Sequence, residues 1–299
     1  MKNSFSLKGL TYLAMAFVMF LASCKDNDKI DFTSNDASNV EGETTADAFS
    51  NDATDVSTDA VNGISDTDFG SRKVISFAAN DRLKCAEVTV IPSPNSTVDI
   101  PSGVITIVYP SNGSCTDARG VVRKGTITIT YSGKRFVAGS TLITTFTDYT
   151  VGGIKIEGTH TITALAPSSA GNLRFNVKIA GGKVTFLGGK TITREQDFTR
   201  EWQRAANPLQ DKWVLLKGSS ALGTTRNSTT YVMEVTEDIV HSRACWISDK
   251  VFIAVSGEKK FVTENKLVTI NFGTGTCDNT VTISINGRSK EVNIAGDGN

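Results

Sequence analysis

Apolar and polar residues alternate along most of the chain that follows Gly70. The segments 125–131, 174–179 and 280–286 alternate without a break. A period of two residues is typical of antiparallel strands that have one buried and one solvent-facing side. More than a dozen segments of this kind occur, and no segment shows a convincing helical period. The pattern therefore predicts an all-β fold.

Short glycine-containing turns separate these segments, at 132–134, 152–153, 180–182 and 188–189. Short strands joined by hairpin-length turns predict an antiparallel meander that forms a sandwich, an open barrel or a long twisted sheet. The alternation breaks at 194–208, which could link two halves of a β body spanning 71–299. The halves would be 71–193 and 209–299.

The two halves resemble each other at one feature. In 105–117 and again in 268–279, a strand ends in an aromatic residue and is followed by Gly, a small residue, Cys and a nearby Asp. One interpretation is an internal repeat. The other is a pair of unrelated hairpins, and the sequence does not decide between them.

Residues 1–23 have the parts of a secretory signal peptide. Lys2 and Lys8 precede an apolar run from Leu10 to Leu21. This run is short for a membrane span, which needs roughly 20 apolar residues. The alternative is an uncleaved N-terminal anchor helix. No second apolar run follows, so the remaining chain is expected to be soluble.

The apolar run ends in Leu21-Ala22-Ser23-Cys24. This tetrapeptide resembles the lipobox of bacterial lipoproteins. The resemblance implies cleavage before Cys24, a diacylglyceryl thioether on its sulfur and a further acyl chain, such as palmitate, on its amine. Two or three chains would give stable membrane anchoring where one is marginal.

The residues after Cys24, Lys25-Asp26-Asn27-Asp28, are similar to the acidic export signals of Bacteroidetes-type lipoproteins. That resemblance implies a lipid anchor in the outer membrane and a surface-exposed body. The remaining chain looks like the uncharacterised β-rich lipoproteins of those bacteria, a family whose pattern implies no known activity.

Four cysteines remain when Cys24 carries lipid. An even number in an exported chain predicts two disulfides. Four cysteines allow three connectivities, and the matched separations of 30 and 32 residues favour Cys85–Cys115 and Cys245–Cys277. Each bond would stabilise the fold by roughly 3–4 kcal/mol on the loop-entropy model. A metal site would need clustered thiolates, which these spacings do not provide.

Residues 24–70 are acidic and poor in apolar side chains. From 25 to 70 there are 2 basic and 12 acidic residues, whereas 71–299 has 27 basic and 19 acidic ones. Low hydrophobicity and one sign of charge predict a disordered tether from the lipidated Cys24, spanning about 40 Å. The alternative is an acidic ligand for a basic partner or for calcium, but the Asp residues lack the spacing of a calcium loop.

Trp202 is the strongest candidate for binding. It lies between Arg200 and Arg204 in the segment where alternation breaks. A tryptophan flanked by charges on a loop can stack on a sugar or anchor a protein partner. The alternative is that Trp202 covers the bottom of the core. Trp213 and Trp246 are predicted to be core residues.

We find no catalytic, cofactor or metal motif in the sequence. His160 is in register with Ile154, Ile156 and Ile162 and is predicted to face the core or the mouth of a barrel, and His241 lies in a polar stretch. Neither belongs to an HExxH motif, and no GxSxG nucleophile elbow occurs. Paired carboxylates can hydrolyse glycosides, and the nearest set is Glu157, Glu195, Asp197 and Glu201.

The sequence thus favours an envelope-anchored lipoprotein with a non-catalytic binding or structural role. Its expected partners are the membrane, through the lipid on Cys24, and a glycan or protein at the cell surface. The charge balance gives no support for nucleic acid. The alternatives are a glycan-directed envelope hydrolase that uses the mid-chain carboxylates, and a purely structural spacer.

Overall fold

The computed structural model describes residues 32–65, 72–77, 82–117, 120–263 and 266–294. This part contains fifteen strands in one antiparallel sheet, which confirms the all-β prediction. The strands are β1 (Lys73–Ile75), β2 (Glu87–Pro92), β3 (Ser102–Tyr109), β4 (Arg123–Ser132), β5 (Thr141–Val151), β6 (Ile154–Leu165), β7 (Leu173–Thr185), β8 (Thr191–Gln203), β9 (Lys212–Leu215), β10 (Ser220–Thr224), β11 (Thr230–Ser242), β12 (Ser256–Thr263), β13 (Lys266–Thr274), β14 (Thr280–Ile285) and β15 (Arg288–Asn293). The helical elements are α2 (Ser34–Gly63), the 3₁₀ turn η2 (Pro208–Gln210) and α3 (Arg243–Ser248).

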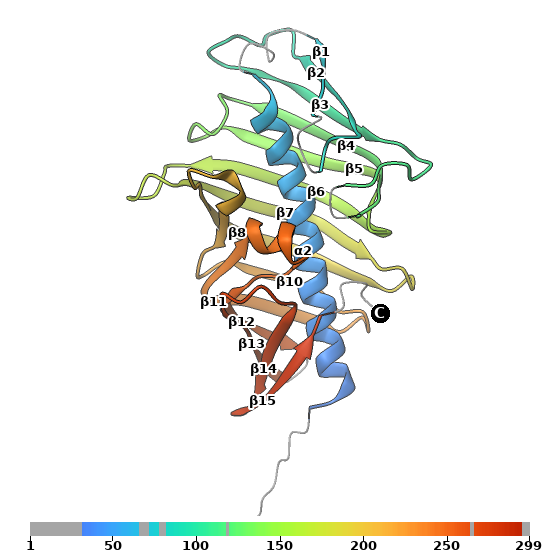
Figure 1. Cartoon of the computed structure of the whole chain (residues 1–299), viewed down its shortest axis with the longest axis vertical. Helices are drawn as coiled ribbons and strands as arrows, with labels where there is room; N and C mark the ends of the chain where they lie inside the picture. The colour runs from blue at the N-terminus through green and yellow to red at the C-terminus, as the bar shows by residue number, and fades with distance from the viewer. Residues whose placement is uncertain (1–31, 66–71, 78–81, 118–119, 264–265, 295–299) are drawn as a thin grey trace, which may run out of the picture. The chain divides into compact units, whose positions relative to one another are not determined.

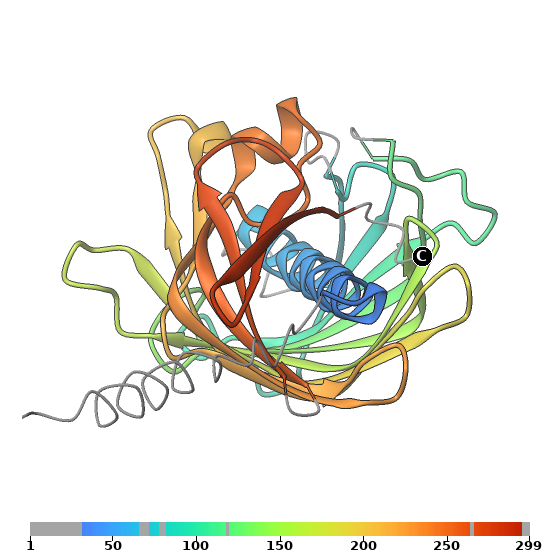
Figure 2. The same cartoon turned by 90° about the horizontal axis from the view of Figure 1, so that it is seen from below.

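The strands follow one another in chain order from β1 to β15. β9 and β10 both lie between β8 and β11, with β9 paired to residues 200–203 of β8 and β10 to residues 193–197. In the described part, β1 and β15 pair with one neighbour each and not with each other. The sheet is therefore a single open meander. It curls around α2, as Figure 1 shows from the side and Figure 2 from one end.

The prediction of a disordered tether over 24–70 is wrong for most of that segment, because Ser34–Gly63 form helix α2. Thr33 caps the helix, because its side chain accepts a hydrogen bond from the Asp36 amide while the Asp36 carboxylate accepts one from the Thr33 amide. This capping box is a strong start signal. Within the helix, Ala46, Ala53, Val56 and Ala60 are fully buried. Cys24 and the residues up to 31 lie outside the described part.

The helix is polar and yet buried on nearly all sides, which explains why no helical period was visible in the sequence. Eighteen of its 30 residues are buried, many of them Asp, Asn, Ser or Thr. An amphipathic pattern arises only where one face meets water. Here the curled sheet surrounds the helix, and its inner side supplies polar partners. Ser57 accepts a hydrogen bond from Thr144 of β5, for example.

Strand β8 corrects a second prediction. Residues 194–203 are not an irregular link but part of a 13-residue strand whose buried positions include Arg194, Gln196 and Arg200. Since β8 pairs with β7 on one side and with β9 and β10 on the other, the proposed boundary between 71–193 and 209–299 falls inside one continuous sheet. Residues 33–299 form one compact unit.

Both predicted disulfides are present. Cys85–Cys115 and Cys245–Cys277 have Cα–Cα distances of 5.4 and 5.1 Å. The two upstream cysteines do not lie in equivalent elements, because Cys85 is in the turn before β2 whereas Cys245 is in α3, so they do not support an internal repeat. His160 faces the core as predicted, and it is buried against α2.

Candidate functional site

The inner side of the sheet presents basic residues to the acidic helix. Arg194 of β8 contacts Glu43 at 3.1 Å and Asp47 at 2.7 Å, and Lys259 of β12 contacts the same two carboxylates at 2.6 and 3.5 Å. These side chains are at most 5% exposed. Although burial alone would raise it, the pKa of Asp47 is lowered because Lys259 and Arg194 outweigh that effect. Buried charges of opposite sign thus replace much of the apolar contact expected between a helix and a sheet.

A second cluster lies nearer the C-terminal end of α2. Arg82 reaches three carboxylates in successive turns, Asp52 at 3.0 Å, Asp55 at 3.4 Å and Asp59 at 2.8 Å. Arg123 of β4 also contacts Asp52, at 2.6 Å. Each of the three carboxylates therefore has an arginine nitrogen within 3.4 Å. Burial, only partly offset by Arg82, raises the pKa of Asp59.

This second cluster borders a small cavity of about 70 Å³, which we call the acidic cleft. All three tryptophans line it, together with Asp52, Asp55, Asp59, Arg82, Arg200, His241 and Arg243 among others. A water molecule needs roughly 10–15 Å³ of such space, so the acidic cleft has room for a few waters. Ligand pockets are usually about 300–1,000 Å³, which makes the acidic cleft small for a sugar.

The predicted binding residues meet at this cleft, but not as an exposed loop. Trp202 is buried in β8, where its indole N–H donates to Asp211 at 3.0 Å. Arg200 points inward and contacts Asp55 at 3.0 Å, whereas Arg204 is exposed and lies over the Trp202 ring at 5.6 Å. Trp202 therefore fits the core alternative better than a sugar platform.

The other two tryptophans also contact arginines. Arg200 lies over the ring of Trp213 at 4.5 Å, and Arg82 lies over the ring of Trp246 at 4.1 Å. Cation–π contacts of this kind hold the guanidinium groups against the walls of the acidic cleft. Burial lowers the pKa of the nearby His241 to about 4, so its ring is neutral at pH 7.

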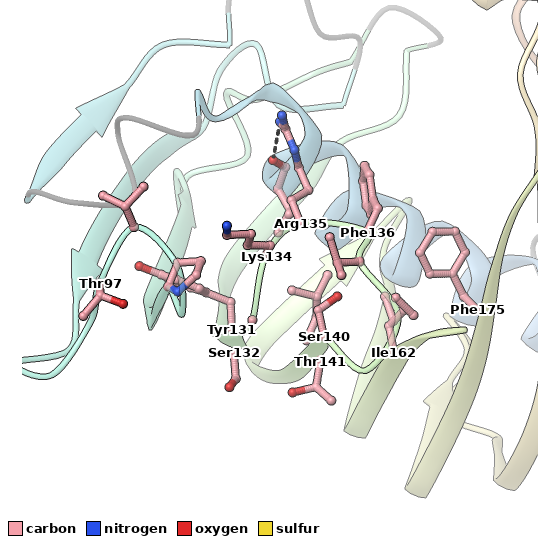
Figure 3. Close-up of a pocket in the computed structure, with 17 residues that line it drawn as sticks. Thr97, Tyr131, Ser132, Lys134, Arg135, Phe136, Ser140, Thr141, Ile162 and Phe175 are labelled. Atoms are coloured by element: carbon pink, nitrogen blue, oxygen red, sulfur yellow. Dashed lines mark hydrogen bonds between the residues drawn. The ribbon is translucent and has the colours of Figure 1, made fainter. Parts of the chain in front are cut away.

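A larger cavity of about 420 Å³, the apolar pocket, lies between the β4–β5 turn and the C-terminal end of α2 (Figure 3). Its lining consists mainly of aliphatic and aromatic side chains with a few hydroxyls: Val61, Thr97, Val98, Pro101, Tyr131, Ser132, Gly133, Lys134, Arg135, Phe136, Val137, Ser140, Thr141, Leu142, Ile162, Ala164 and Phe175. Its volume falls in the usual range for small-molecule sites. No local sequence signal marks this pocket, because its residues come from four separated segments and from the end of α2.

The two basic residues at the apolar pocket are already paired. Arg135 donates to the Asn62 and Ile64 carbonyls at the end of α2, at 2.9 Å each. It thereby satisfies carbonyl groups that a helix end leaves without partners. Lys134 pairs with Asp99 at 2.9 Å, in an exposed position.

An aromatic wall separates the apolar pocket from the acidic cleft. The rings of Phe136 and Phe175 line the pocket and meet edge to face, with centroids 5.6 Å apart. Phe136 also packs edge to face on Trp202 at 5.9 Å, and Trp202 stacks on Trp213 at 5.2 Å. A ligand in the pocket would therefore contact rings that are coupled directly to two tryptophans.

The mid-chain carboxylates lie elsewhere. Glu195, Asp197 and Glu201 occupy the outward positions of β8, between the buried inward ones. Asp197 pairs with Lys178, and Glu157 with Lys155 and Lys183. None of the four lines the apolar pocket or the acidic cleft.

Within the described residues, no helix is long and apolar enough to cross a membrane, and no group of His, Cys, Asp and Glu is placed to hold a metal ion. Comparison of the chain with family models, curated proteins and solved structures finds no match.

Proposed function

We propose that the chain is an envelope-anchored lipoprotein that binds a small apolar molecule without catalysis. The observation that carries this proposal is the apolar pocket of about 420 Å³. A concave, mainly apolar site with a few polar groups is the usual form of a small-molecule site.

The lining of the apolar pocket supports an uncharged ligand. Lys134 and Arg135 are engaged with Asp99 and with the end of α2, so a ligand anion would have to displace existing partners. The hydroxyls of Ser132, Ser140 and Thr141 offer hydrogen bonds at the edge of an otherwise apolar surface. The ligand class we propose is therefore a compact apolar molecule with at most a few hydroxyl or carbonyl groups.

A fluorescent apolar probe, N-phenyl-1-naphthylamine, tests the site. Ala164 is buried in β6 and lines the apolar pocket, so Ala164→Phe should fill part of the cavity and abolish probe binding. Thr163→Phe adds the same ring to the opposite face of the same strand and serves as the matched control. Equal probe binding by the two variants would contradict the proposed site.

The anchor we propose is the lipid on Cys24. Only nine residues, 25–33, separate Cys24 from the first residue of α2, and a chain of this length reaches at most about 30 Å. The folded body would thus be held closer to the outer membrane than a 46-residue coil would hold it. Incorporation of a labelled fatty acid by the wild type, lost in Cys24→Ser, is the expected result. Equal labelling would contradict the anchor.

A glycan-directed hydrolase has less support. The four mid-chain carboxylates lie outside both cavities, and three of them occupy the outward face of β8. A glycosidase needs two carboxyl groups facing one another across a substrate site. A non-catalytic role therefore fits the geometry better.

A further inference from the structure

Four large aliphatic side chains form a continuous row on the outer face of the sheet. Leu222 of β10 is the cross-strand partner of Val232 in β11, which is the partner of Val262 in β12, which in turn is the partner of Leu267 in β13. They are 53%, 55%, 40% and 47% exposed. We call this set the apolar row. With strands roughly 4.8 Å apart, it extends for about 14 Å.

The apolar row differs from the rest of the outer face nearby. The next row of cross-strand partners, two residues along each strand, is polar: Ser220, Glu234, Lys260 and Thr269. Single exposed aliphatic residues are ordinary on a soluble protein, but four adjacent ones in register indicate a contact surface.

The apolar row lies beside the point where the proposed lipid tether leaves the body. Lys266, the residue before Leu267, contacts both carboxylate oxygens of Asp36 at 3.0 Å, so the first turn of α2 lies at this corner of the sheet. The chain that precedes Thr33 leads to Cys24 within nine residues, at most about 30 Å. The membrane that holds the lipid must therefore lie within about 30 Å of this corner.

We propose that the apolar row rests on the bilayer into which the Cys24 lipid inserts. The inference depends on the proposed lipid anchor. The row would orient the body, while the acyl chains provide the affinity, because lipid chains alone suffice for stable attachment. Glu234 and Lys260, which are cross-strand partners in the next row, offset each other's charge, so the contact does not require anionic lipid.

An environment-sensitive fluorophore tests this orientation. The four described cysteines form two disulfides. If Cys24 is acylated or replaced, an introduced cysteine is therefore the single reactive thiol. We would label Val232→Cys with a nitrobenzoxadiazole dye in the lipidated chain and reconstitute it in phosphatidylcholine vesicles. Val108→Cys is the matched control, since Val108 is 44% exposed on the outer face of β3, far along the sheet.

The expected result is brighter, blue-shifted emission and quenching by nitroxide lipids for the dye at position 232, with no change for the dye at position 108. Equal responses at both positions, or none at 232 in vesicle-bound protein, would overturn the proposed surface while leaving the anchor intact. Absence of vesicle association by the lipidated chain would instead overturn the anchor and this inference together. The same dye at position 232 would also be measured in the unlipidated Cys24→Ser chain without vesicles. A blue shift there that grows with protein concentration would show that a second copy of the chain covers the apolar row, and it would overturn the proposal.

Discussion

His160 links the stability of the buried helix to pH. Thr54 of α2 donates its hydroxyl hydrogen to the Ser50 carbonyl at 3.0 Å, so its oxygen accepts from Nδ1–H of His160 at 3.1 Å. Burial, reinforced by Arg194, lowers the pKa of His160 to about 3. The unfolded chain takes up a proton near pH 6.5, whereas the folded chain keeps the ring neutral. Stability therefore falls as the pH falls through 6.5 and levels off near 3.

We expect His160→Gln to reduce this acid sensitivity. Between pH 7.5 and pH 5 the unfolding free energy of the wild type should fall by about 2 kcal/mol more than that of the variant. The reason is that the variant lacks the imidazole that takes up a proton in the unfolded chain but not in the folded one. Urea unfolding at the two pH values measures the difference. His241, with its pKa lowered to about 4, should contribute separately, so His160→Gln/His241→Asn should be flatter still. Parallel losses in wild type and His160→Gln would contradict this assignment.

The positive charge of Lys259 balances the negative charges of two buried carboxylates of α2, Glu43 and Asp47. Lys259→Met should cost about 3–5 kcal/mol, because Glu43 and Asp47 would then have Arg194 as their one remaining ion-pair partner among the described residues, in a buried site. Lys260→Met is the matched control, since Lys260 is the next residue along β12 and is exposed, and its cost should stay within about 0.5 kcal/mol. Urea unfolding measures both. Adding Glu43→Gln to Lys259→Met should recover part of the lost unfolding free energy. If Lys259→Met cost no more than Lys260→Met, Lys259 would not be needed to balance the buried carboxylates.

At the scale of elements, each disulfide ties a loop or helix to the neighbouring loop. Cys115 lies between β3 and β4, and Cys245 lies in α3. Replacing either pair by serines, as in Cys85→Ser/Cys115→Ser, should lower the unfolding free energy by about 3–4 kcal/mol, because about 30 residues are released in the unfolded chain. Urea unfolding of oxidised wild type and variant checks the magnitude. Free thiols in the unreduced wild-type body would contradict the pairing itself.

The regular strands could be predicted from sequence because their inward positions are apolar. β4 and β14, for example, alternate isoleucine, valine or tyrosine with threonine or serine, and both are strands. β8 is not recognisable from sequence, because Arg194, Gln196 and Arg200 take inward positions that normally hold apolar residues. Burial alternates along β8, but polar or charged residues stand at both its inward and its outward positions, so the sequence shows no alternation of apolar and polar residues there.

Helix α2 is not recognisable from sequence periodicity for a related reason. Periodicity analysis detects a helix by the contrast between a dry face and a wet face. Here Glu43, Asp47 and Asp52 are buried beside Ala46 and Ala53, so that contrast is absent. The Thr33 and Asp36 capping box was a readable start signal. The apolar pocket depends on where α2 ends, so it could not be predicted without the helix.

At the scale of the whole molecule, the acidic segment and the basic body are partners. Helix α2 contains seven acidic residues and no basic ones. Its ion pairs join residues 71 positions apart, as in Asp52–Arg123, and up to 230 apart, as in Asp36–Lys266. The sequence showed the imbalance, and an acidic ligand for a basic partner was one of its two interpretations. What it could not show was that the partner is the same chain.

The two proposed surfaces lie toward opposite ends of α2. Asp36 marks the corner that holds the apolar row, and Val61 lines the apolar pocket. Their separation of 25 residues corresponds to about 38 Å of helix. The apolar row crosses four successive strands, in the direction in which α2 also crosses the sheet (Figure 1). A body that rests on the bilayer at the apolar row would therefore carry its pocket about 38 Å farther along the body.

The central position of α2 also determines how the body should unfold. The helix contacts strands from β4, through Arg123, to β13, through Lys266, and β8 joins the two sides of the sheet without a break. Without α2, Arg82 of 71–193 and Lys259 of 209–299 would both lose the helix carboxylates that they contact. We therefore expect one cooperative transition, with equal calorimetric and van't Hoff enthalpies.

Differential scanning calorimetry, together with tryptophan fluorescence and far-ultraviolet circular dichroism, tests this cooperativity. Trp202 and Trp213 report on the middle of the sheet, whereas circular dichroism reports on all strands, so the two signals should change together. Lys259→Met removes a charge from β12 and should move the entire transition to lower temperature, because the helix that it destabilises is shared by both sides. If the transition instead split in two and only one component moved, the halves would be independent and α2 would belong to one of them.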